Sequence, residues 1–504
     1  MVIYQNIANL LHYASVNLEL DELDVVWTRN LLLSELKLTG YIDYQIDEDA
    51  IEELKCPDTL LEPIANYALA QGLTTADGKE AFGAKIMNLL MRRPGEMADT
   101  FEGVRQKNPQ RAGDWFYDTC IKANYVRLSA ITANKHWDAK GTKGRLEITI
   151  NTSKPEKSNK DTAASLAQKN ESYPLCVICK ENEGLNAGSI VRQNLRTIPV
   201  ILGGEEWFWQ FSPYSYYNQH MIAVSREHVP MNVDANSIGK LFDFVDYMPH
   251  YFIGVNAPLP RIGGSVLTHD HFQGGYKSLP IHKAPIRAKL VSEKYPLLEI
   301  GIVDWYNNIL RISGVHRKMV YDLAVSVHQA WEKYDDEKAE IVSATGEEKH
   351  NATSITVRRE DTKQGKKYTC DVTLRNNRTD DKYPDGIFHA HPEYHYIKSE
   401  SIGLIEAQGL FILPGRLERQ LDEVSKYITR EVKYAPEKLT ADMKPFAGMI
   451  EKIAENSKGK PTKLEAELSI RDEIALACEA ILVNTAVFKD DDGFKKFLGT
   501  VGLK

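Results

Sequence analysis

The sequence has few cysteines, no long apolar run and no surplus of positive charge. Its 504 residues include six cysteines, too few and too scattered for a disulfide framework. No apolar run reaches the roughly 18 residues that a membrane span needs, and the best candidate, 474–488, is interrupted by Glu479 and Asn484. The first residues, MVIYQNIANLL, have neither the basic start nor the cleavage site of a secretory signal. These absences predict a chain of the reducing cytoplasm with no membrane anchor.

The charge balance excludes a general affinity for polyanions. Lysine and arginine number 62 and aspartate and glutamate 70, so the formal net charge is −8. No overall basic field therefore attracts nucleic acid or an anionic membrane, although a local basic pocket for a phosphate stays open. With 43% hydrophobic and 26% charged residues the composition is that of a globular protein. At roughly 150 residues per domain, the length predicts about three units.

Hydrophobic spacing divides the chain into helical ends and a strand-rich middle. Apolar residues recur every three or four positions near the N-terminus, as in Val16, Leu20 and Leu23, and again after 416, as in Leu417 and Leu421. No chemistry-bearing motif marks the first region, which we expect to be an accessory or oligomer-forming part. We predict a helical N-terminal region over 1–140, a first unit over 141–300, a second strand-rich unit over 301–415 and a helical C-terminal region over 416–504.

Local patterns add expected elements within the middle of the chain. Alternation predicts strands over 145–151, 191–202 and 220–224, and an amphipathic helix over 237–245. Aromatic residues crowd the window 207–217, where we expect core packing rather than a ligand platform. Two strand-rich halves each end in an H-x-H motif, a pattern that indicates a duplicated unit.

The segment Arg261–Gly275, RIGGSVLTHDHFQGG, has the strongest functional pattern. Pairs of glycines at 263–264 and 274–275 flank His269, His271 and Gln273. Alternate residues of a strand share one face, so these three polar side chains are expected to project together. Paired glycines let the backbone approach a ligand closely. A satisfied core histidine is the ordinary alternative, but three aligned polar groups between glycine pairs favour a functional site.

This H-x-H-x-Q pattern favours group transfer through a covalent intermediate on a histidine. A neutral imidazole is a competent nucleophile near neutral pH and forms a phosphoramidate when it attacks phosphorus. The Gln273 amide donates a hydrogen bond to phosphoryl oxygens but cannot protonate a leaving group. Transfer between phosphate or alcohol acceptors is therefore favoured over hydrolysis, although water is not excluded as an acceptor.

A second group of residues has the ligand types of a metal site. Cys176 and Cys179 form a C-x-x-C pair, and two thiolates at this spacing bind one ion. His228 and His269 are candidates for the other two positions of a zinc tetrahedron. The alternatives are two reduced cysteines with no metal, or a redox pair, which the missing βαβ pattern disfavours.

A third group follows the second strand-rich stretch. His389, His391 and His395 alternate and are expected on one strand face, where they would bind a second metal, line the pocket or form a polar strand edge. Glu406 and Gln408 are predicted on the next strand, where they either bind sugar hydroxyls or satisfy local backbone groups.

Several of these segments together resemble the type 2 galactose-1-phosphate uridylyltransferases of bacteria. The resemblance rests on GGSVLTHDHFQGG, PLCVICKENEG, GVNAPLP and GIFHAHPEYHYIKSESIGLIEAQGLFILPGRL, and it spans nearly the whole chain. It implies an α+β fold in which duplicated antiparallel sheets of the histidine-triad type form a nucleotide cleft, with helical regions at both ends. It also implies conversion of UDP-glucose and galactose 1-phosphate to glucose 1-phosphate and UDP-galactose, through a uridylylated histidine.

The resemblance also assigns residue roles. In the related type 1 motif H-P-H-x-Q the second histidine is the nucleophile and the glutamine holds a phosphoryl oxygen, which implies these roles for His271 and Gln273. Asp270 departs from the motif, because it stands where the proline would be. The implied ligands of a structural zinc are Cys176, Cys179, His228 and His269. The expected substrate-binding residues are Asn194, Asn256, Gly263, Gly264, Ser265, Lys154, Lys157, Glu406 and Gln408.

Two other functions stay open at this point. A histidine-triad nucleotide hydrolase or phosphorylase would use the same fold and nucleophile. A zinc-stabilised binding protein would use the aromatic window to hold a partner and would never form a uridylylated species. A homodimer is also expected, because active sites of duplicated folds can be shared between subunits.

Overall fold

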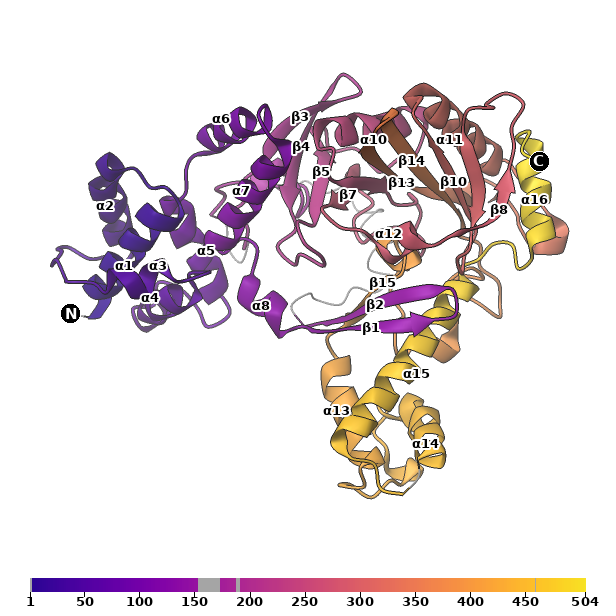
Figure 1. Ribbon diagram of the computed structural model, residues 1–504. Coiled ribbons are helices and arrows are strands. Elements are labelled where there is room, and N and C mark those ends of the chain that lie inside the picture. Colours follow the sequence, from indigo (N-terminus) through magenta and orange to yellow (C-terminus); the bar gives the residue numbers. More distant parts are fainter. Residues whose placement is uncertain (1, 153–172, 187–190, 458) are drawn as a thin grey trace. The chain divides into compact units, whose positions relative to one another are not determined.

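A computed structural model describes residues 2–152, 173–186, 191–457 and 459–504, which form two compact units (Figure 1). Unit 1 consists of Met1–Thr132, Asn170–Val229 and Gln273–Tyr276, and unit 2 of Ala133–Lys169, Pro230–Phe272 and Lys277–Lys504. Helices and antiparallel strands occur in both units, so the expected α+β class is confirmed. The four regions predicted from the sequence, with boundaries at 140, 300 and 415, stay a prediction. No helix among the described residues is long and apolar enough to cross a membrane.

The N-terminal part of unit 1 consists of helices that bury one face. In α1 the buried residues Ile3, Ile7, Leu10 and Leu11 recur at helical spacing, and Asn108 caps α7 by accepting a hydrogen bond from the Arg111 N–H. The helices are α1 (Val2–Asn17), α2 (Val25–Glu35), α3 (Glu48–Glu52), α4 (Asp58–Ala70), α5 (Lys79–Leu90), α6 (Pro94–Arg105), α7 (Pro109–Lys122) and α8 (Leu128–Ala133).

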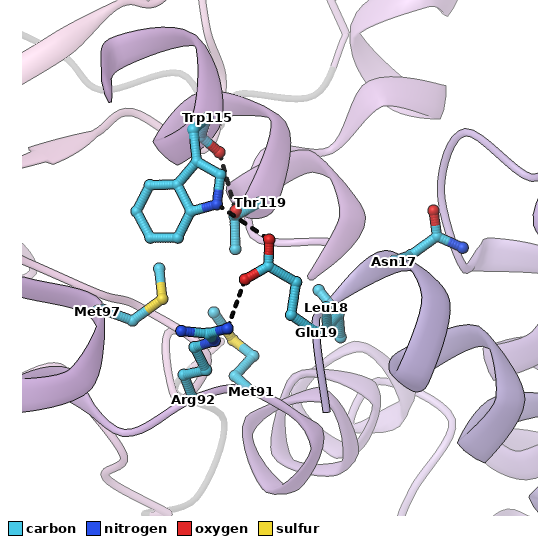
Figure 2. A pocket seen from close by; sticks show the side chains of 8 residues that line it. All are labelled: Asn17, Leu18, Glu19, Met91, Arg92, Met97, Trp115 and Thr119. Atoms are coloured by element: carbon cyan, nitrogen blue, oxygen red, sulfur yellow. Dashed lines mark hydrogen bonds and ion pairs between the residues drawn. The ribbon is translucent and has the colours of Figure 1, made fainter. Parts of the chain in front are cut away.

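Glu19 links the end of α1 to the helices that follow (Figure 2). Its Oε2 lies 2.6 Å from Arg92 Nη2, and its Oε1 accepts a 3.4 Å hydrogen bond from the Trp115 indole N–H. Figure 2 shows these groups around a small pocket that Met91 and Met97 also line. Because the Glu19 carboxylate is occupied by Arg92 and Trp115, we assign this pocket a packing role.

Unit 1 also has three antiparallel strands. They are β3 (Ile198–Leu202), β4 (Glu205–Phe211) and β5 (Met221–Ser225), in the order β3-β4-β5. Trp209 and Phe211 are fully buried, and the Trp209 ring lies 5.3 Å from that of Phe116. The expectation that the aromatic window packs in a core is therefore confirmed for these residues.

The strand predicted over 191–202 was too long, because β3 begins only at Ile198. The residues before it donate hydrogen bonds to carbonyls next to helix ends instead of to a neighbouring strand. Asn194 donates from Nδ2 to the Ala123 carbonyl at 2.8 Å, and Arg196 donates from Nε to the Arg92 carbonyl at 2.8 Å. The strand predicted over 220–224 is confirmed as β5, shifted by one residue.

Unit 2 contains a six-stranded antiparallel arrangement and a separate three-stranded sheet. The six strands follow the order β6-β13-β14-β10-β9-β8, and in the other sheet β2 pairs antiparallel with β1 and parallel with β15. The predicted strand 145–151 is confirmed within β2. The nine strands of these two sheets are β1 (Lys135–Gly141), β2 (Gly144–Asn151), β6 (Phe252–Val255), β8 (Ile286–Leu290), β9 (Glu299–Val303), β10 (Ile309–Gly314), β13 (Asn351–Thr362), β14 (Gly365–Asn376) and β15 (Leu410–Pro414).

The two faces of the six strands differ in what they contact. Helices α10 (Ala235–Tyr247) and α11 (Arg317–Trp331) pack on one face, where α11 residue His328 contacts Thr353 of β13 at 2.9 Å. The predicted helix 237–245 is thus confirmed. Alternation turns Ser354 and Thr356 to the other face, where Ser354 Oγ accepts from the Ala257 N–H and Thr356 Oγ1 from Gln408 Nε2. This second, polar face therefore holds the segments that carry several candidate site residues.

The last part of unit 2 is helical, as expected after residue 416. Thr462 and Glu465 form a capping box at the start of the longest helix, α15. The remaining helices of unit 2 are α12 (Leu404–Ala407), α13 (Leu417–Ile428), α14 (Ala447–Asn456), α15 (Lys463–Asn484) and α16 (Asp491–Thr500). Figure 1 shows α13, α14 and α15 grouped together.

Candidate active site and metal centre

The predicted nucleophile and its amide neighbour lie on one short strand. Strand β7 (His271–Gly275) begins at His271, and Gln273 follows two positions later, so both side chains project from the same face. The expectation that His269 shares this strand face is wrong, because His269 precedes the strand. The His269 carbonyl contacts the His271 ring at 2.8 Å instead of pairing with a neighbouring strand.

The hydrogen bond of His271 determines which ring nitrogen is nucleophilic. A carbonyl oxygen only accepts, so the 2.8 Å contact to His269 requires a proton on Nδ1 of His271. In the neutral ring the lone pair is then on Nε2. Burial lowers the pKa of His271 to about 4, although the hydrogen bond to the His269 backbone opposes that shift, so the ring is neutral near pH 7. The geometry therefore provides an imidazole with a free Nε2 lone pair.

Asp270, between the two histidines, is almost fully buried, at 8% exposure. Burial raises the pKa of its carboxyl to about 6, while the charge of Lys240 opposes that rise. One carboxyl oxygen, Oδ1, is buried without a hydrogen-bond partner. The residue that replaces the motif's proline is therefore a second titratable group beside the nucleophile.

The glycine segment before β7 is tightly folded. A Cβ atom at Gly263 would lie 2.4 Å from the Ala257 carbonyl oxygen, so only glycine fits there. Arg261 has a φ of +67°, a left-handed conformation that is uncommon outside glycine. Its guanidinium donates to Asn377 Oδ1 at 3.1 Å, which holds this turn in place. Gly264 and Ser265 follow directly in the chain.

The predicted substrate-binding residues outside this segment have different surroundings. Asn256 is buried, and its Oδ1 accepts a 2.7 Å hydrogen bond from the Leu404 N–H. Asn194 is buried and holds the Ala123 carbonyl, as described above. Lys154 and Lys157 lie outside the described residues. Substrate binding by these four residues stays a prediction.

Glu406 and Gln408 are not on a strand, contrary to expectation. Glu406 lies in the short helix α12, and Gln408 caps its C-terminal end. Gln408 donates from Nε2 to Thr356 Oγ1 at 3.1 Å, while its Oε1 is buried without a hydrogen-bond partner. At the N-terminus of α12, Glu406 Oε2 accepts a 3.2 Å hydrogen bond from the Gly403 N–H. This contact stabilises a helical turn in place of the predicted strand.

The Cys-x-x-Cys pair and His228 form a cluster of metal-ligand type. The two sulfur atoms lie 3.4 Å apart, and Cys179 Sγ lies 3.3 Å from His228 Nδ1. Asn182 donates to the carbonyls of Cys176 and Cys179 at 3.0 and 2.9 Å, which fixes the loop between them. The hydrogen bond with Cys179 is the main cause that lowers the pKa of the Cys176 thiol.

This cluster includes all four residues expected as zinc ligands. In the described part of the chain, one group of potential ligands satisfies the geometry of a metal site, and it consists of Cys176, Cys179, His228 and His269. Their ligand atoms all lie within 4.8 Å of one another. Two thiolates and two imidazole nitrogens are a donor set that suits Zn²⁺. The residues therefore fit a zinc ion, and the identity of the metal belongs to the proposal below.

The second histidine group does not form a strand face. His389 and His391 lie in an irregular segment, and the 3₁₀ turn Pro392–Tyr394 separates them from His395. Each ring contacts a nearby carbonyl, with His391 Nε2 3.0 Å from the Ile387 oxygen and His395 Nε2 2.9 Å from the Ala390 oxygen. Pro392 cannot donate to a ladder, which explains why the alternating pattern fails here.

Sequence reasoning missed two buried cations beside α12. Arg375 is fully buried on β14, and Lys398 is 4% exposed in the segment before the helix. Lys398 Nζ lies 3.5 Å from Glu406 Oε1. Alternation along β14 places Arg375 on the face of Asp371 and Thr373, and this run of polar residues in a buried strand was the available signal.

Comparison with known proteins gives consistent matches along the chain. Residues 36–230 match the model for the N-terminal domain of galactose-1-phosphate uridyl transferase, and residues 244–441 match the model for its C-terminal domain. The galactose-1-phosphate uridylyltransferase of Caldanaerobacter subterraneus is 37% identical over 514 residues, covering 99% of this chain and 98% of its own. That of Bacillus subtilis is 38% identical over 518 residues, covering 100% and 99%.

One solved structure was also matched. Yeast Ap4A phosphorylase Apa2 is 12% identical to this chain, with a TM-score of 0.35, and the match covers 62% of this chain and 90% of that one.

Proposed function

The chain belongs to the galactose-1-phosphate uridylyltransferase family of nucleotidyltransferases, and from this membership we propose that it transfers the uridylyl group of UDP-glucose to galactose 1-phosphate. The products are glucose 1-phosphate and UDP-galactose. The observation that supports this proposal within the site is the orientation of His271, whose Nδ1 proton is held by the His269 carbonyl and whose Nε2 keeps its lone pair.

In the first half-reaction, His271 Nε2 attacks the α-phosphorus of UDP-glucose. A P–N bond forms while the bond between that phosphorus and the bridging oxygen breaks, and glucose 1-phosphate leaves with the electron pair. A phosphate monoester has a second pKa near 6, so it leaves near neutral pH without a proton donor. The Gln273 amide, which donates hydrogen bonds and no proton, therefore suffices to hold a non-bridging oxygen.

The second half-reaction reverses the same bonds with a different sugar. A phosphate oxygen of galactose 1-phosphate attacks the uridylyl phosphorus, the P–N bond breaks and UDP-galactose leaves. Because Nδ1 keeps its proton, the uridylylated ring is a cation and therefore a good leaving group. The ring returns to its neutral form with Nε2 free for the next cycle, since the His269 carbonyl holds the Nδ1 proton throughout.

We further propose that Cys176, Cys179, His228 and His269 hold a structural zinc ion. When bound, zinc would supply tetrahedral cross-linking of these residues and no step of the transfer. The support is the donor set within 4.8 Å. The chain's own contribution is that His269 leads directly into the nucleophile, so fixing its side chain also fixes the carbonyl that orients His271.

Three further expectations belong to this proposal. The substrate-binding roles of Asn256, Gly263, Gly264 and Ser265 are supported by their place in the tight segment before the nucleophile. The cytoplasm as the compartment is supported by the six scattered cysteines and by C-x-x-C ligands that need reduced thiols. A homodimer stays a prediction, which the mass of the purified protein in solution tests directly.

Mass spectrometry of the intact protein tests the function. We expect UDP-glucose alone to add one uridylyl group per active chain, located on His271 by peptide mapping, and galactose 1-phosphate to remove it as UDP-galactose. Active protein without this adduct would contradict the mechanism. Turnover of UDP-glucose with no sugar phosphate present would instead support a hydrolase, and inorganic phosphate as a sufficient acceptor would support a phosphorylase.

A further inference from the structure

Helix α12 (Leu404–Ala407) begins at a buried carboxylate with two different partners. Glu406 Oε2 accepts a 3.2 Å hydrogen bond from the Gly403 N–H, and Glu406 Oε1 lies 3.5 Å from Lys398 Nζ. Lys398 also donates to the Ile412 carbonyl at 3.0 Å. Both oxygens of Glu406 are thus engaged with the chain itself, which favours a role in holding structure over direct contact with a sugar.

The carboxylate balances two cations that are taken out of water. Arg375 is fully buried and donates from Nη2 to the Ile402 carbonyl at 2.8 Å, immediately before the helix. Burial lowers the pKa of Arg375 to about 10, and the charge of Glu406 opposes that shift. Removing the charge of Glu406 would leave Arg375 and Lys398 beside a helix turn without their main counter-ion.

The start of α12 directly contacts the segment that leads to the nucleophile. The Leu404 N–H donates to Asn256 Oδ1 at 2.7 Å, and the Ile402 N–H donates to the Arg261 carbonyl at 3.3 Å. Gly403 lies so close to Asn256 that a Cβ atom there would be 3.1 Å from Asn256 Oδ1, and it would also be in van der Waals contact with the Gly263 carbonyl oxygen at 3.5 Å.

The contacted segment needs such support. Arg261 is held in a left-handed conformation, with a φ of +67°, and such strain persists only where the surroundings impose it. The hydrogen bonds from Ile402 to Arg261 and from Leu404 to Asn256 come from one turn. The start of α12 therefore supports residues 256–264, and this segment ends seven residues before the strand that begins at His271.

We propose that Glu406 is a positioning residue for uridylyl transfer, because it fixes the first turn of α12 and, through Leu404, holds Asn256 and the glycine segment 256–264 that leads to His271. This inference rests on the proposed function. It adds a residue that acts on both half-reactions equally, since both pass through the same histidine. It also assigns Glu406 a different task from binding sugar hydroxyls.

Single-turnover kinetics of Glu406→Ala and Glu406→Asp test the proposal. We expect Glu406→Ala to slow uridylylation by UDP-glucose and its discharge by galactose 1-phosphate by a similar factor, about tenfold to a hundredfold, with little change in either KM. Glu406→Asp keeps the charge and is expected to recover most of the rate. Glu400→Gln is the matched control, because Glu400 lies 3.8 Å from the same Lys398 but does not cap the helix.

A second variant probes the same contact from the glycine side. Gly403 has extended backbone angles that alanine adopts freely, so Gly403→Ala is expected to fold while its methyl group, 3.1 Å from Asn256 Oδ1, pushes that side chain away. The rates of both half-reactions should fall as in Glu406→Ala. This variant keeps the proposal testable if Glu406→Ala fails to fold.

Two results would overturn the inference. One is an unchanged rate in both half-reactions with only a lower melting temperature, which would make Glu406 merely structural. The other is a raised KM for galactose 1-phosphate alone, which would make Glu406 a sugar ligand. Failure of the proposed function is a distinct outcome, because the wild-type protein would then form no uridylyl adduct at all.

Discussion

The two H-x-H segments of this chain have nearly the same residue pattern and entirely different structures. In the first, His271 begins a strand, Gln273 lies on the same face, and the chain before them folds tightly around Gly263. In the second, His391 lies in an irregular segment, and its ring stacks on that of Tyr383 with the centroids 3.9 Å apart.

The difference shows that the residues around a motif decide its use. Gln273 and two further glycines continue the first motif, and a strand with amide chemistry follows. Pro392 continues the second, and a 3₁₀ turn follows, where Nε2 of His391 and Nε2 of His395 each contact a nearby carbonyl. Nothing in the three letters H-x-H distinguishes a nucleophile from a histidine that holds a loop together.

Exchanging the nucleophilic histidine for alanine should give the largest contrast. We expect His271→Ala to lower turnover by about 10⁴-fold or more, because it removes the imidazole that forms the covalent adduct. The matching change in the second motif, His391→Ala, should keep the adduct and most of the activity. Steady-state assays and intact-protein mass spectra measure both, and an adduct on the His271→Ala protein would remove the basis of the comparison.

Substitutions two positions after the second histidine of each motif should give a smaller difference in activity. Gln273→Ala is expected to raise the barrier of transfer by about 2–4 kcal/mol, as for the loss of one donor to a developing negative charge. Glu393, its counterpart in the second motif, is largely exposed, with 59% of its side chain accessible, and Glu393→Ala should stay within about twofold of wild type. Rates of adduct formation decide this, and equal losses at both positions would contradict a specific role for the amide.

Substituting a metal ligand should change the rate of transfer least, but it should clearly lower the stability of the protein. Cys179→Ser is expected to reduce bound zinc, measured by elemental analysis, and to lower the free energy of unfolding by roughly 0.5–3 kcal/mol. Cys56→Ser, at a partly exposed cysteine outside the cluster, is the control. A metal-free wild-type protein with an unchanged melting temperature would argue against a structural ion.

Sequence reasoning was strongest where chemistry and local pattern agree. The four proposed zinc ligands lie in one cluster, and the predicted strand 145–151 and helix 237–245 were found close to their expected bounds. These outcomes depend on residue types with few alternative roles, or on periodicity within one element. The same reasoning failed at 191–197, where Asn194 and Arg196 donate hydrogen bonds to carbonyls next to helix ends far away in the sequence.

The other failures share a physical cause. Alternation predicted strands around His391 and Glu406, but a proline removes one ladder donor and a carboxylate caps a helical turn instead. The sequence did not single out Arg375 and Lys398, because what distinguishes them is that they are buried, and burial depends on contacts far along the chain. Periodicity reports which side chains share a face, and it does not report what covers that face.

The acceptor that orients the nucleophile belongs to the backbone of His269, which has a consequence for how such proteins diverge. No amino-acid replacement at position 269 deletes a carbonyl, so the tautomer of His271 is protected from mutation as long as the chain follows the same path. A lineage can therefore discard the ion by changing the His269 side chain and still inherit a correctly protonated imidazole. Only a chemically synthesised or semisynthetic chain, with the backbone carbonyl of residue 269 replaced, would lose the acceptor for His271 while keeping the His269 side chain.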